Sequence, residues 1–326
     1  KKLFLHRPFC DEPEDQPMDI RIENLTKRFG PQKAVDNISF DVKTGEIVGF
    51  LGPNGAGKST TMKMITGYLG IGEGDIFIGD KSVRQHGDEL KRHIGYLPEN
   101  NPLYTDMPVI DYLIFSAELQ GLDKAKIPGR VREMIEVTGL KAEKHKKIGE
   151  LSKGYRQRVG LAQAMIHDPE ILILDEPTTG LDPNQIVEIR KLIRELGQHK
   201  TVILSTHILP EVEATCDRIL IINKGKIVAN GTAESLRSQS SGSAVMRVVI
   251  EGGPAELIKS AISKLPGIRQ VVITDAQSGK LEVTAEPGTV LGRSLFYMCV
   301  EKGWVLTEAV PVETRLEDIF RNLTLN

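Results

Sequence analysis

Hydrophobic residues along the chain follow two patterns, and each pattern predicts a different kind of strand. Continuous apolar runs occur at 46–51 and 171–174, and the second is typical of a parallel strand that is buried on both faces. Alternating runs bounded by turn residues occur near 20–25, 38–42 and 75–78. Because strands with one covered face alternate in this way, these three segments predict an antiparallel sheet at the edge of the core.

Between about 105 and 168 the apolar residues recur at helical spacing. Pro108 suits the first turn of a helix. The apolar positions of that helix are Tyr112, Leu113, Phe115 and Leu119, and those of a second helix are Val131, Met134, Ile135 and Leu140. The segment therefore predicts a helical subdomain, although apolar spacing alone also fits a plain helical insertion.

A change in composition after Arg237 predicts a domain boundary. Residues 238–243 are small and polar, which favours a linker. The next segments predict strand, helix, strand, strand, helix and strand, at 245–250, 256–265, 271–274, 281–285, 291–300 and 304–310. This βαββαβ order predicts a small α+β ferredoxin-like domain over 244–326, with a last helix at 316–323. Its strands lack the aromatic residues that RNA-binding domains of this fold use for stacking, so a regulatory or dimer-supporting role is favoured.

Composition limits the classes of function. The 326 residues suit two domains, and 42 basic against 44 acidic side chains give a net charge of −2, which argues against a nucleic-acid partner. The cysteines, Cys10, Cys216 and Cys299, lack metal-ligand spacing and match a reducing compartment. No apolar run approaches the roughly 18 residues of a membrane-spanning helix, so reaching a membrane would require a partner. Residues 1–17 predict a loose leader before a domain that covers 18–237.

The clearest candidate for chemistry follows the apolar run at 46–51. It reads Gly52-Pro53-Asn54-Gly55-Ala56-Gly57-Lys58-Ser59-Thr60 and leads into a predicted helix at 61–65. Glycines let successive backbone N–H groups point at phosphates, Lys58 can reach the β- and γ-phosphates, and Ser59 can coordinate Mg²⁺. The motif predicts binding of a nucleoside triphosphate. Guanine is disfavoured, because the one candidate guanine motif, at 223–226, ends in lysine instead of aspartate.

A second motif supplies carboxylates. The apolar run at 171–174 ends in Asp175 and Glu176. At the carboxyl end of a buried strand, Asp175 can hold Mg²⁺ through its water shell and Glu176 can accept a proton from an attacking water. Two solvated acids at a strand end would be the alternative, but the phosphate loop upstream favours the catalytic interpretation.

Three further motifs occur in a set order around this strand. They are Leu151-Ser152-Lys153-Gly154-Tyr155-Arg156-Gln157-Arg158, then Leu181-Asp182-Pro183, then a predicted strand at 201–206 that ends in His207. With these motifs the chain, over about 20 to 235, resembles the nucleotide-binding subunit of ATP-binding cassette (ABC) transporters. The resemblance implies an α/β P-loop NTPase fold, ATP and Mg²⁺ as ligands, and ATP hydrolysis coupled to transport.

The resemblance also assigns roles to single residues. It implies that Phe29 stacks on adenine, that Ser152 and Gly154 contact the γ-phosphate of ATP held by a second, identical subunit, and that Asp182 links the two sites. His207 would hold the γ-phosphate and the attacking water. It further implies a membrane-spanning permease as partner and a peripheral location on the cytoplasmic face of the membrane. Ser152 could cap a helix that points its N-terminus at the anion, which supports its role independently.

Two departures from the family pattern stand out. Lys153 and Tyr155 replace the glycine and glutamine of the usual signature Leu-Ser-Gly-Gly-Gln. Glu99 stands where many relatives have glutamine, and a carboxylate beside a triphosphate predicts a sharper dependence on Mg²⁺. The stretch 94–104, the signature variant and 180–185 are most similar to the gliding-motility-associated subunits, within a broader exporter-like group.

Two other functions remain open from the sequence. One is a soluble cassette ATPase that remodels nucleic acid, ribosomes or proteins, but such proteins carry coiled-coil or zinc-bearing insertions or a second cassette, and this chain shows none of these patterns. The other is a regulatory module with negligible turnover, which the presence of both Glu176 and His207 disfavours.

Overall fold

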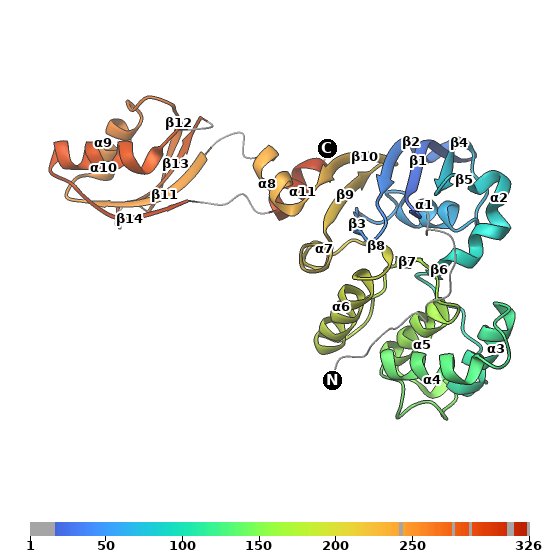
Figure 1. Ribbon diagram of the computed structural model, residues 1–326. Helices are drawn as coiled ribbons and strands as arrows, with labels where there is room; N and C mark the ends of the chain where they lie inside the picture. Colours follow the sequence, from blue (N-terminus) through green and yellow to red (C-terminus); the bar gives the residue numbers. More distant parts are fainter. Residues whose placement is uncertain (1–16, 241–243, 276–277, 287–288, 312–315, 325–326) are drawn as a thin grey trace. The chain divides into compact units, whose positions relative to one another are not determined.

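The computed structural model describes residues 17–240, 244–275, 278–286, 289–311 and 316–324 (Figure 1). The chain divides into two compact units, one ending at Asn230 and the other beginning at Gly231. Of the expected leader at 1–17, only Pro17 belongs to the described residues. No described helix combines the length and apolar character that crossing a bilayer requires.

The first unit is built on a six-stranded sheet with the order β10-β9-β3-β8-β7-β6. The strands are β3 (Ile47–Leu51), β6 (Ile94–Leu97), β7 (Ile171–Asp175), β8 (Thr201–Thr206), β9 (Arg218–Asn223) and β10 (Lys226–Gly231). The pairs β9-β3, β3-β8, β8-β7 and β7-β6 are parallel. Every residue of β3, β7 and β8 is buried, which explains the apolar runs of β3 and β7.

A second sheet of this unit has the order β2-β1-β4-β5. It comprises β1 (Ile20–Phe29), β2 (Gln32–Val42), β4 (Glu73–Ile78) and β5 (Lys81–Ser82), and its neighbouring strands are antiparallel. The alternating segments of the sequence lie here, and the strands extend beyond them. Side chains such as Ile22, Phe40 and Ile76 are buried with Val48 and Phe50 of β3, so the edge sheet packs on the parallel core.

Helices complete the first unit. They are α1 (Lys58–Ile65), α2 (Val83–Leu90), α3 (Val109–Leu119), α4 (Ile127–Val137), α5 (Lys153–Met165), α6 (Pro183–Gly197) and α7 (Leu209–Thr215), with short 3₁₀ turns η1 (Lys91–His93) and η2 (Ile148–Glu150). Helices α3, α4 and α5 lie together as the green part of Figure 1. Their buried residues share one core with Leu97, Leu172 and Leu174 of the parallel sheet, so the helical segment packs on the sheet that carries the site.

The second unit contains α8 (Ala233–Ser240), β11 (Ala244–Glu251), α9 (Ala255–Ile262), β12 (Ile268–Asp275), β13 (Lys280–Ala285), α10 (Leu291–Lys302), β14 (Val305–Pro311) and α11 (Leu316–Thr324). Its four-stranded sheet has the order β12-β13-β11-β14 with antiparallel pairs. Residues of α9 and α10, among them Ile258, Ile262 and Leu295, are buried with Val248 and Leu281 of the sheet.

The boundary between the two units lies between Asn230 and Gly231, upstream of the linker expected at 238–243. Helix α8 already begins at Ala233 and covers 238–240, whereas 241–243 lie outside the described residues. The helix starts there because the hydroxyl of Thr232 accepts a hydrogen bond from the Ser235 N–H at 3.1 Å, a helix N-cap. Leu236, in the first turn of this helix, is buried. Small polar residues after Arg237 thus continue a helix that starts earlier.

Candidate functional site

The glycine-rich loop joins β3 to α1, and its two ends are closely packed at Gly52 and Gly57. Gly55 and Gly57 have φ of 77° and 109°, a backbone conformation that favours glycine. A Cβ atom on Gly57 would lie 2.4 Å from the Ala34 carbonyl oxygen, and one on Gly52 would lie 2.4 Å from that of Ile222. The loop is therefore held in one shape by its neighbours, with the N-terminus of α1 directed at it, as a phosphate cradle requires.

Lys58 folds back over this loop. Its Nζ donates hydrogen bonds to the carbonyl oxygens of Gly52 at 2.8 Å and Pro53 at 3.3 Å. The same Nζ lies 3.5 Å from Oε1 of Glu176, and both side chains are only 6% exposed. The ammonium group is thus positioned beside the cradle and next to the carboxylate at the end of β7.

Asp175 and Ser59 line a cavity of about 280 Å³ beside the loop, together with Tyr96, Glu99 and Asn101. Burial raises the pKa of the Asp175 carboxyl, while hydrogen bonds from the Ser205 and Ser59 hydroxyls act in the opposite direction. Among the described residues, Oδ2 of Asp175, the Tyr96 hydroxyl and Nδ2 of Asn101 are buried atoms without a hydrogen-bond partner. Three unsatisfied polar atoms around one cavity call for a polar ligand or water.

This cavity suits magnesium better than a transition metal. The described residues contain no group of three or more His, Cys, Asp or Glu side chains that could hold a metal by themselves. Mg²⁺ is usually bound by one or two carboxylates, with waters and substrate phosphates completing its shell. A hydroxyl from Ser59 and the free oxygen of Asp175 fit that pattern.

Glu176 is held in an unusual conformation at the end of β7. Its φ is 51°, which a non-glycine residue adopts only at a cost of about 1 to 3 kcal/mol. Its backbone N–H donates to the Ser205 carbonyl at 3.0 Å. Its carboxylate lies 2.9 Å from Nδ1 of His207 and accepts a hydrogen bond from the Thr179 hydroxyl at 3.2 Å. The predicted base, Glu176, and the histidine predicted to hold the γ-phosphate, His207, are therefore in direct contact.

A residue that the sequence analysis overlooked supports both of these side chains. Glu211 of α7 is only 1% exposed. It accepts hydrogen bonds from the Thr178 hydroxyl at 2.5 Å and the Thr206 hydroxyl at 2.8 Å, and it lies 3.8 Å from Nη2 of Arg190 on α6. Thr178 is two residues after Glu176, and Thr206 directly precedes His207, so one buried carboxylate connects the ends of β7 and β8.

The expected adenine contact, Phe29, is the last residue of β1. Its ring is 51% exposed, and Nζ of Lys27 lies 5.8 Å from the ring centroid. Phe29 pairs with Gln32 in the hairpin, two residues before Ala34, whose carbonyl lies against Gly57. The hairpin therefore brings an exposed aromatic ring close to the phosphate loop.

Ser152, Gly154 and Asp182 lie at two adjoining helix N-termini. The hydroxyl of Ser152 accepts a hydrogen bond from the Tyr155 N–H at 3.4 Å and caps α5. Asp182 caps α6, and its carboxylate accepts from the Gln185 N–H at 2.9 Å. A Cβ on Gly154 would lie 2.4 Å from the Gln185 side-chain oxygen, so the two caps pack on each other. The contacts found for these residues are with one another and their own helices, not with the phosphate loop.

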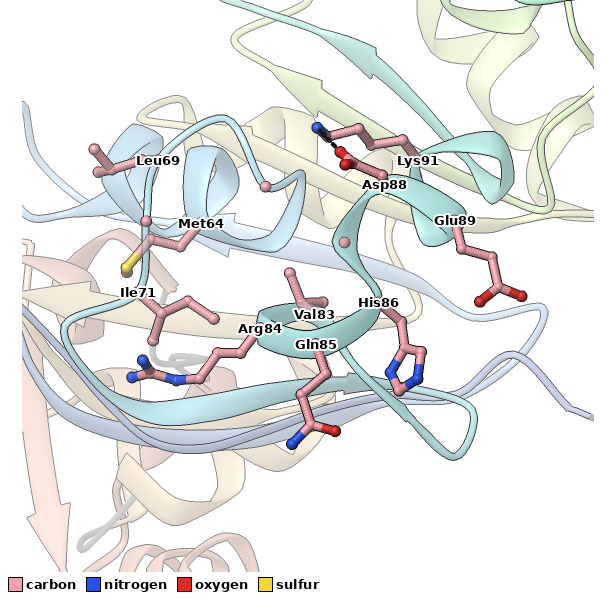
Figure 2. Close-up of a pocket in the computed structure, with 13 residues that line it drawn as sticks. Met64, Leu69, Ile71, Val83, Arg84, Gln85, His86, Asp88, Glu89 and Lys91 are labelled. Carbon is pink, nitrogen blue, oxygen red and sulfur yellow. Dashed lines mark hydrogen bonds and ion pairs between the residues drawn. The ribbon is translucent and has the colours of Figure 1, made fainter.

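A separate hollow between α1 and α2 has a different character (Figure 2). Its charged side chains already have partners within the protein: Lys91 bonds to Asp88 at 2.7 Å, and Arg84 donates to the carbonyls of Gly72 and Gly74 at 2.8 and 2.9 Å. Its volume is about 600 Å³. Because these charges are satisfied internally, we do not include this hollow in the site.

Comparison with known proteins agrees with the geometry. Residues 35–179 match the family model described as "ABC transporter". An uncharacterized ABC transporter ATP-binding protein of Bacillus subtilis (strain 168), YxlF, is 36% identical over 302 residues, covering 92% of this chain and 98% of that protein. The linearmycin resistance ATP-binding protein LnrL of the same strain is 34% identical over 308 residues, covering 94% and 98%.

A solved structure is also similar. It is described as the structure of an ATP binding subunit of an ABC transporter, has 30% sequence identity and a TM-score of 0.63, and is matched over 68% of this chain and 93% of its own. The two sequence relatives are matched over more of the chain, so the similarity to them extends into both units.

Proposed function

Because this chain belongs to the ATP-binding subunits of ABC transporters, we propose that two copies of it bind two Mg-ATP molecules between them. Hydrolysis then drives transport through a separate permease that spans the membrane. The observation that carries this proposal is the division of the site: Lys58, Glu176 and His207 are in contact beside the loop, whereas Ser152 and Gly154 pack at another pair of helix ends.

In this proposal each chain supplies complementary halves of two sites. The loop and Lys58 hold the triphosphate, Phe29 stacks on adenine, and the helix N-terminus capped by Ser152 meets the γ-phosphate from the opposite copy. Asp182 lies next to the helix end capped by Ser152, because Gln185 packs on Gly154. A two-fold dimer would bring both halves together twice.

The proposed hydrolysis step uses contacts of the described residues. Glu176 accepts a proton from the attacking water, and His207, 2.9 Å from its carboxylate, orients that water and the γ-phosphate. Ser59 and Asp175 would hold magnesium beside Glu99. When bound, the ion neutralises charge on the phosphate oxygens.

Energies of the expected size allow ATP to switch the dimer. Three charge-assisted hydrogen bonds at each of two sites would contribute about 9 to 18 kcal/mol, at about 1.5 to 3 kcal/mol each. Association costs about 4 to 15 kcal/mol. Because these terms nearly balance, loss of the γ-phosphates can open the dimer, and a near-complete population change needs only about 5.5 kcal/mol.

Similarity to LnrL, a linearmycin resistance ATP-binding protein, supports an exporter role. A role in gliding motility is supported by the sequence motifs at 94–104 and 180–185. We propose that the second unit is a ferredoxin-like domain that supports the dimer, because its βαββαβ order and its sheet order β12-β13-β11-β14 suit that fold. A peripheral position on the cytoplasmic face of the membrane follows from the proposed permease.

Mixing two inactive variants tests the divided site. Lys58→Ala should disable the loop half and Ser152→Arg the signature half, so each alone should release little phosphate from Mg-ATP. In a 1:1 mixture, half of the dimers would be mixed and would keep one intact site, so about a quarter of the wild-type rate should return if the sites act independently. A mixture that neither recovers activity nor forms an ATP-dependent dimer by size-exclusion chromatography would contradict the proposal.

Purification distinguishes a transporter subunit from a soluble ATPase. We expect the tagged chain, taken from detergent-solubilised membranes of its own cells, to carry an integral membrane protein in stoichiometric amount. Retention of the chain entirely in the soluble fraction, bound to ribosomes or nucleic acid, would favour the alternative function.

Glu211 should act on turnover more than on nucleotide affinity. Glu211→Leu removes the acceptor shared by Thr178 and Thr206, so we expect kcat to fall by about 10- to 100-fold as Glu176 and His207 lose alignment. KM for ATP should change much less, because the loop contacts of Lys58 are untouched. Glu211→Gln keeps one acceptor oxygen and should recover part of the loss. Steady-state phosphate release, with Glu213→Gln on the same helix as control, would measure this; a change in KM alone would refute it.

A further inference from the structure

Tyr96 on β6 is a polar residue to which the proposed mechanism gives no role. Its ring packs against the apolar core that β3 shares with α1. Its hydroxyl oxygen is buried and has no hydrogen-bond partner among the described residues. Leaving a buried hydroxyl without a partner costs free energy. The position of this hydroxyl therefore calls for a partner from outside the chain.

The sheet directs Tyr96 to the same place as Asp175. Tyr96 pairs with Ile173 in the parallel ladder of β6 and β7, so these two side chains lie on one face of the sheet. Asp175 is two residues after Ile173, which puts its side chain on that face as well. Both Tyr96 and Asp175 line the cavity of about 280 Å³ beside the phosphate loop.

One oxygen of Asp175 is available in this cavity. Its Oδ1 accepts a hydrogen bond from the Ser205 hydroxyl, whereas its Oδ2 has no partner among the described residues. The Tyr96 hydroxyl and the Asp175 Oδ2 are thus two unsatisfied atoms that can both accept a hydrogen bond. A ligand with two protons to donate would satisfy both.

The charges around the cavity favour a cation. The carboxylates of Asp175 and Glu99 line it against one basic side chain, Lys63. Burial is the largest cause of a raised pKa at the Tyr96 hydroxyl, and the carboxylates of Asp175 and Glu99 add to it. The phenol therefore keeps its proton, and its oxygen is a neutral acceptor that does not compete with the carboxylates for the cation.

We propose that Tyr96 is a positioning residue for magnesium, and that its hydroxyl oxygen and the Oδ2 of Asp175 accept the two protons of one water in the ion's shell. This inference rests on the proposed Mg-ATP function and adds a residue to the same site. Mg²⁺ usually keeps several of its waters when a protein binds it. A water shared in this way would satisfy both buried oxygens, and it would fix the direction of the Asp175 carboxylate toward the metal.

Tyr96→Phe removes the acceptor and keeps the ring. AMP-PNP, which resists hydrolysis, should be titrated into the full chain by calorimetry, once with saturating Mg²⁺ and once with EDTA. The Kd in EDTA divided by the Kd in Mg²⁺ measures how strongly the metal supports nucleotide binding. We expect this ratio to fall by about 10- to 100-fold in Tyr96→Phe, as for other groups that orient a metal ligand. The Kd in EDTA should change less than about twofold.

Two other tyrosines are matched controls. Tyr68 lines the same cavity but is 77% exposed, so Tyr68→Phe should change the ratio less than about twofold. Tyr112 is buried and donates to the Gln163 side chain at 2.8 Å. Without metal or nucleotide, Tyr112→Phe should therefore lower the Tm, whereas Tyr96→Phe should not, because its hydroxyl bonds to no other described residue.

The outcomes separate this inference from the proposed function. An unchanged ratio in Tyr96→Phe, or an equal fall in Tyr68→Phe, would overturn the role of Tyr96. A lower Tm of metal-free Tyr96→Phe together with an unchanged ratio would assign the hydroxyl to the stability of the fold instead. In each of these cases AMP-PNP still binds, so the proposed function stands. A wild-type chain that binds no AMP-PNP under either condition would overturn both.

Discussion

Glu176→Gln should abolish ATP hydrolysis and leave ATP binding intact. The amide has nearly the shape of the carboxylate, so it can keep the backbone bond from Glu176 to Ser205 and a contact with Thr179. It cannot accept the proton of the attacking water. Since a positioned general base contributes about 10²- to 10⁴-fold, we expect phosphate release to fall by at least about 100-fold.

The trapped state should be visible as well. With hydrolysis blocked, Mg-ATP should hold Glu176→Gln as a dimer, which size-exclusion chromatography with light scattering would detect. Glu195→Gln is a matched control, because Glu195 is an exposed carboxylate on α6 with only a distant partner, Lys191 at 3.9 Å. Wild-type turnover by Glu176→Gln would exclude Glu176 as the base.

Lys58→Ala should have the second large effect, on nucleotide affinity. In the structure the Lys58 ammonium bonds to two loop carbonyls and lies beside Glu176, where it can reach the phosphates. Losing two charge-assisted hydrogen bonds, at about 1.5 to 3 kcal/mol each, would weaken ATP binding by at least about 100-fold. Isothermal titration calorimetry with Mg-ATP would measure the change directly.

Stability must be measured with the same variant. Removing Lys58 takes away one partner of the buried Glu176 carboxylate, and breaking a buried pair commonly destabilises a protein. Thermal unfolding should therefore accompany the calorimetry, with Lys191→Ala as an exposed control whose side chain is 78% accessible. Unchanged ATP affinity in a folded Lys58→Ala protein would contradict the assignment of the phosphate cradle.

Motifs with a rigid local geometry were predictable from sequence. The loop at 52–60 specifies its own shape through glycines at positive φ, and the apolar run before Asp175 specifies a buried strand. Residues whose role depends on distant contacts were not predictable. Glu211 follows a proline in an ordinary amphipathic segment, and only the fold brings it to Thr178, which is 33 residues away along the chain.

Helix boundaries and helix faces show the same limit. The segment 238–240 looks like a linker by composition, yet it continues a helix whose cap and buried leucine lie upstream. The apolar positions of α3 and α4 predicted two helices, but spacing could not separate side chains that are buried, such as Tyr112, from those left exposed, such as Leu119. That separation depends on tertiary packing, which overrides local pattern.

Glu176 contacts two side chains that are also expected to bind ATP. Its carboxylate already engages the Lys58 ammonium and the His207 imidazole, the same two groups that the terminal phosphate would need. Binding of ATP would therefore have to displace the Glu176 carboxylate from these two groups, and the apparent affinity for ATP would fall by the fraction of molecules in which these internal contacts are made. The neutral amide of Glu176→Gln would hold the Lys58 ammonium less strongly, so that variant should bind ATP at least as tightly as the wild type.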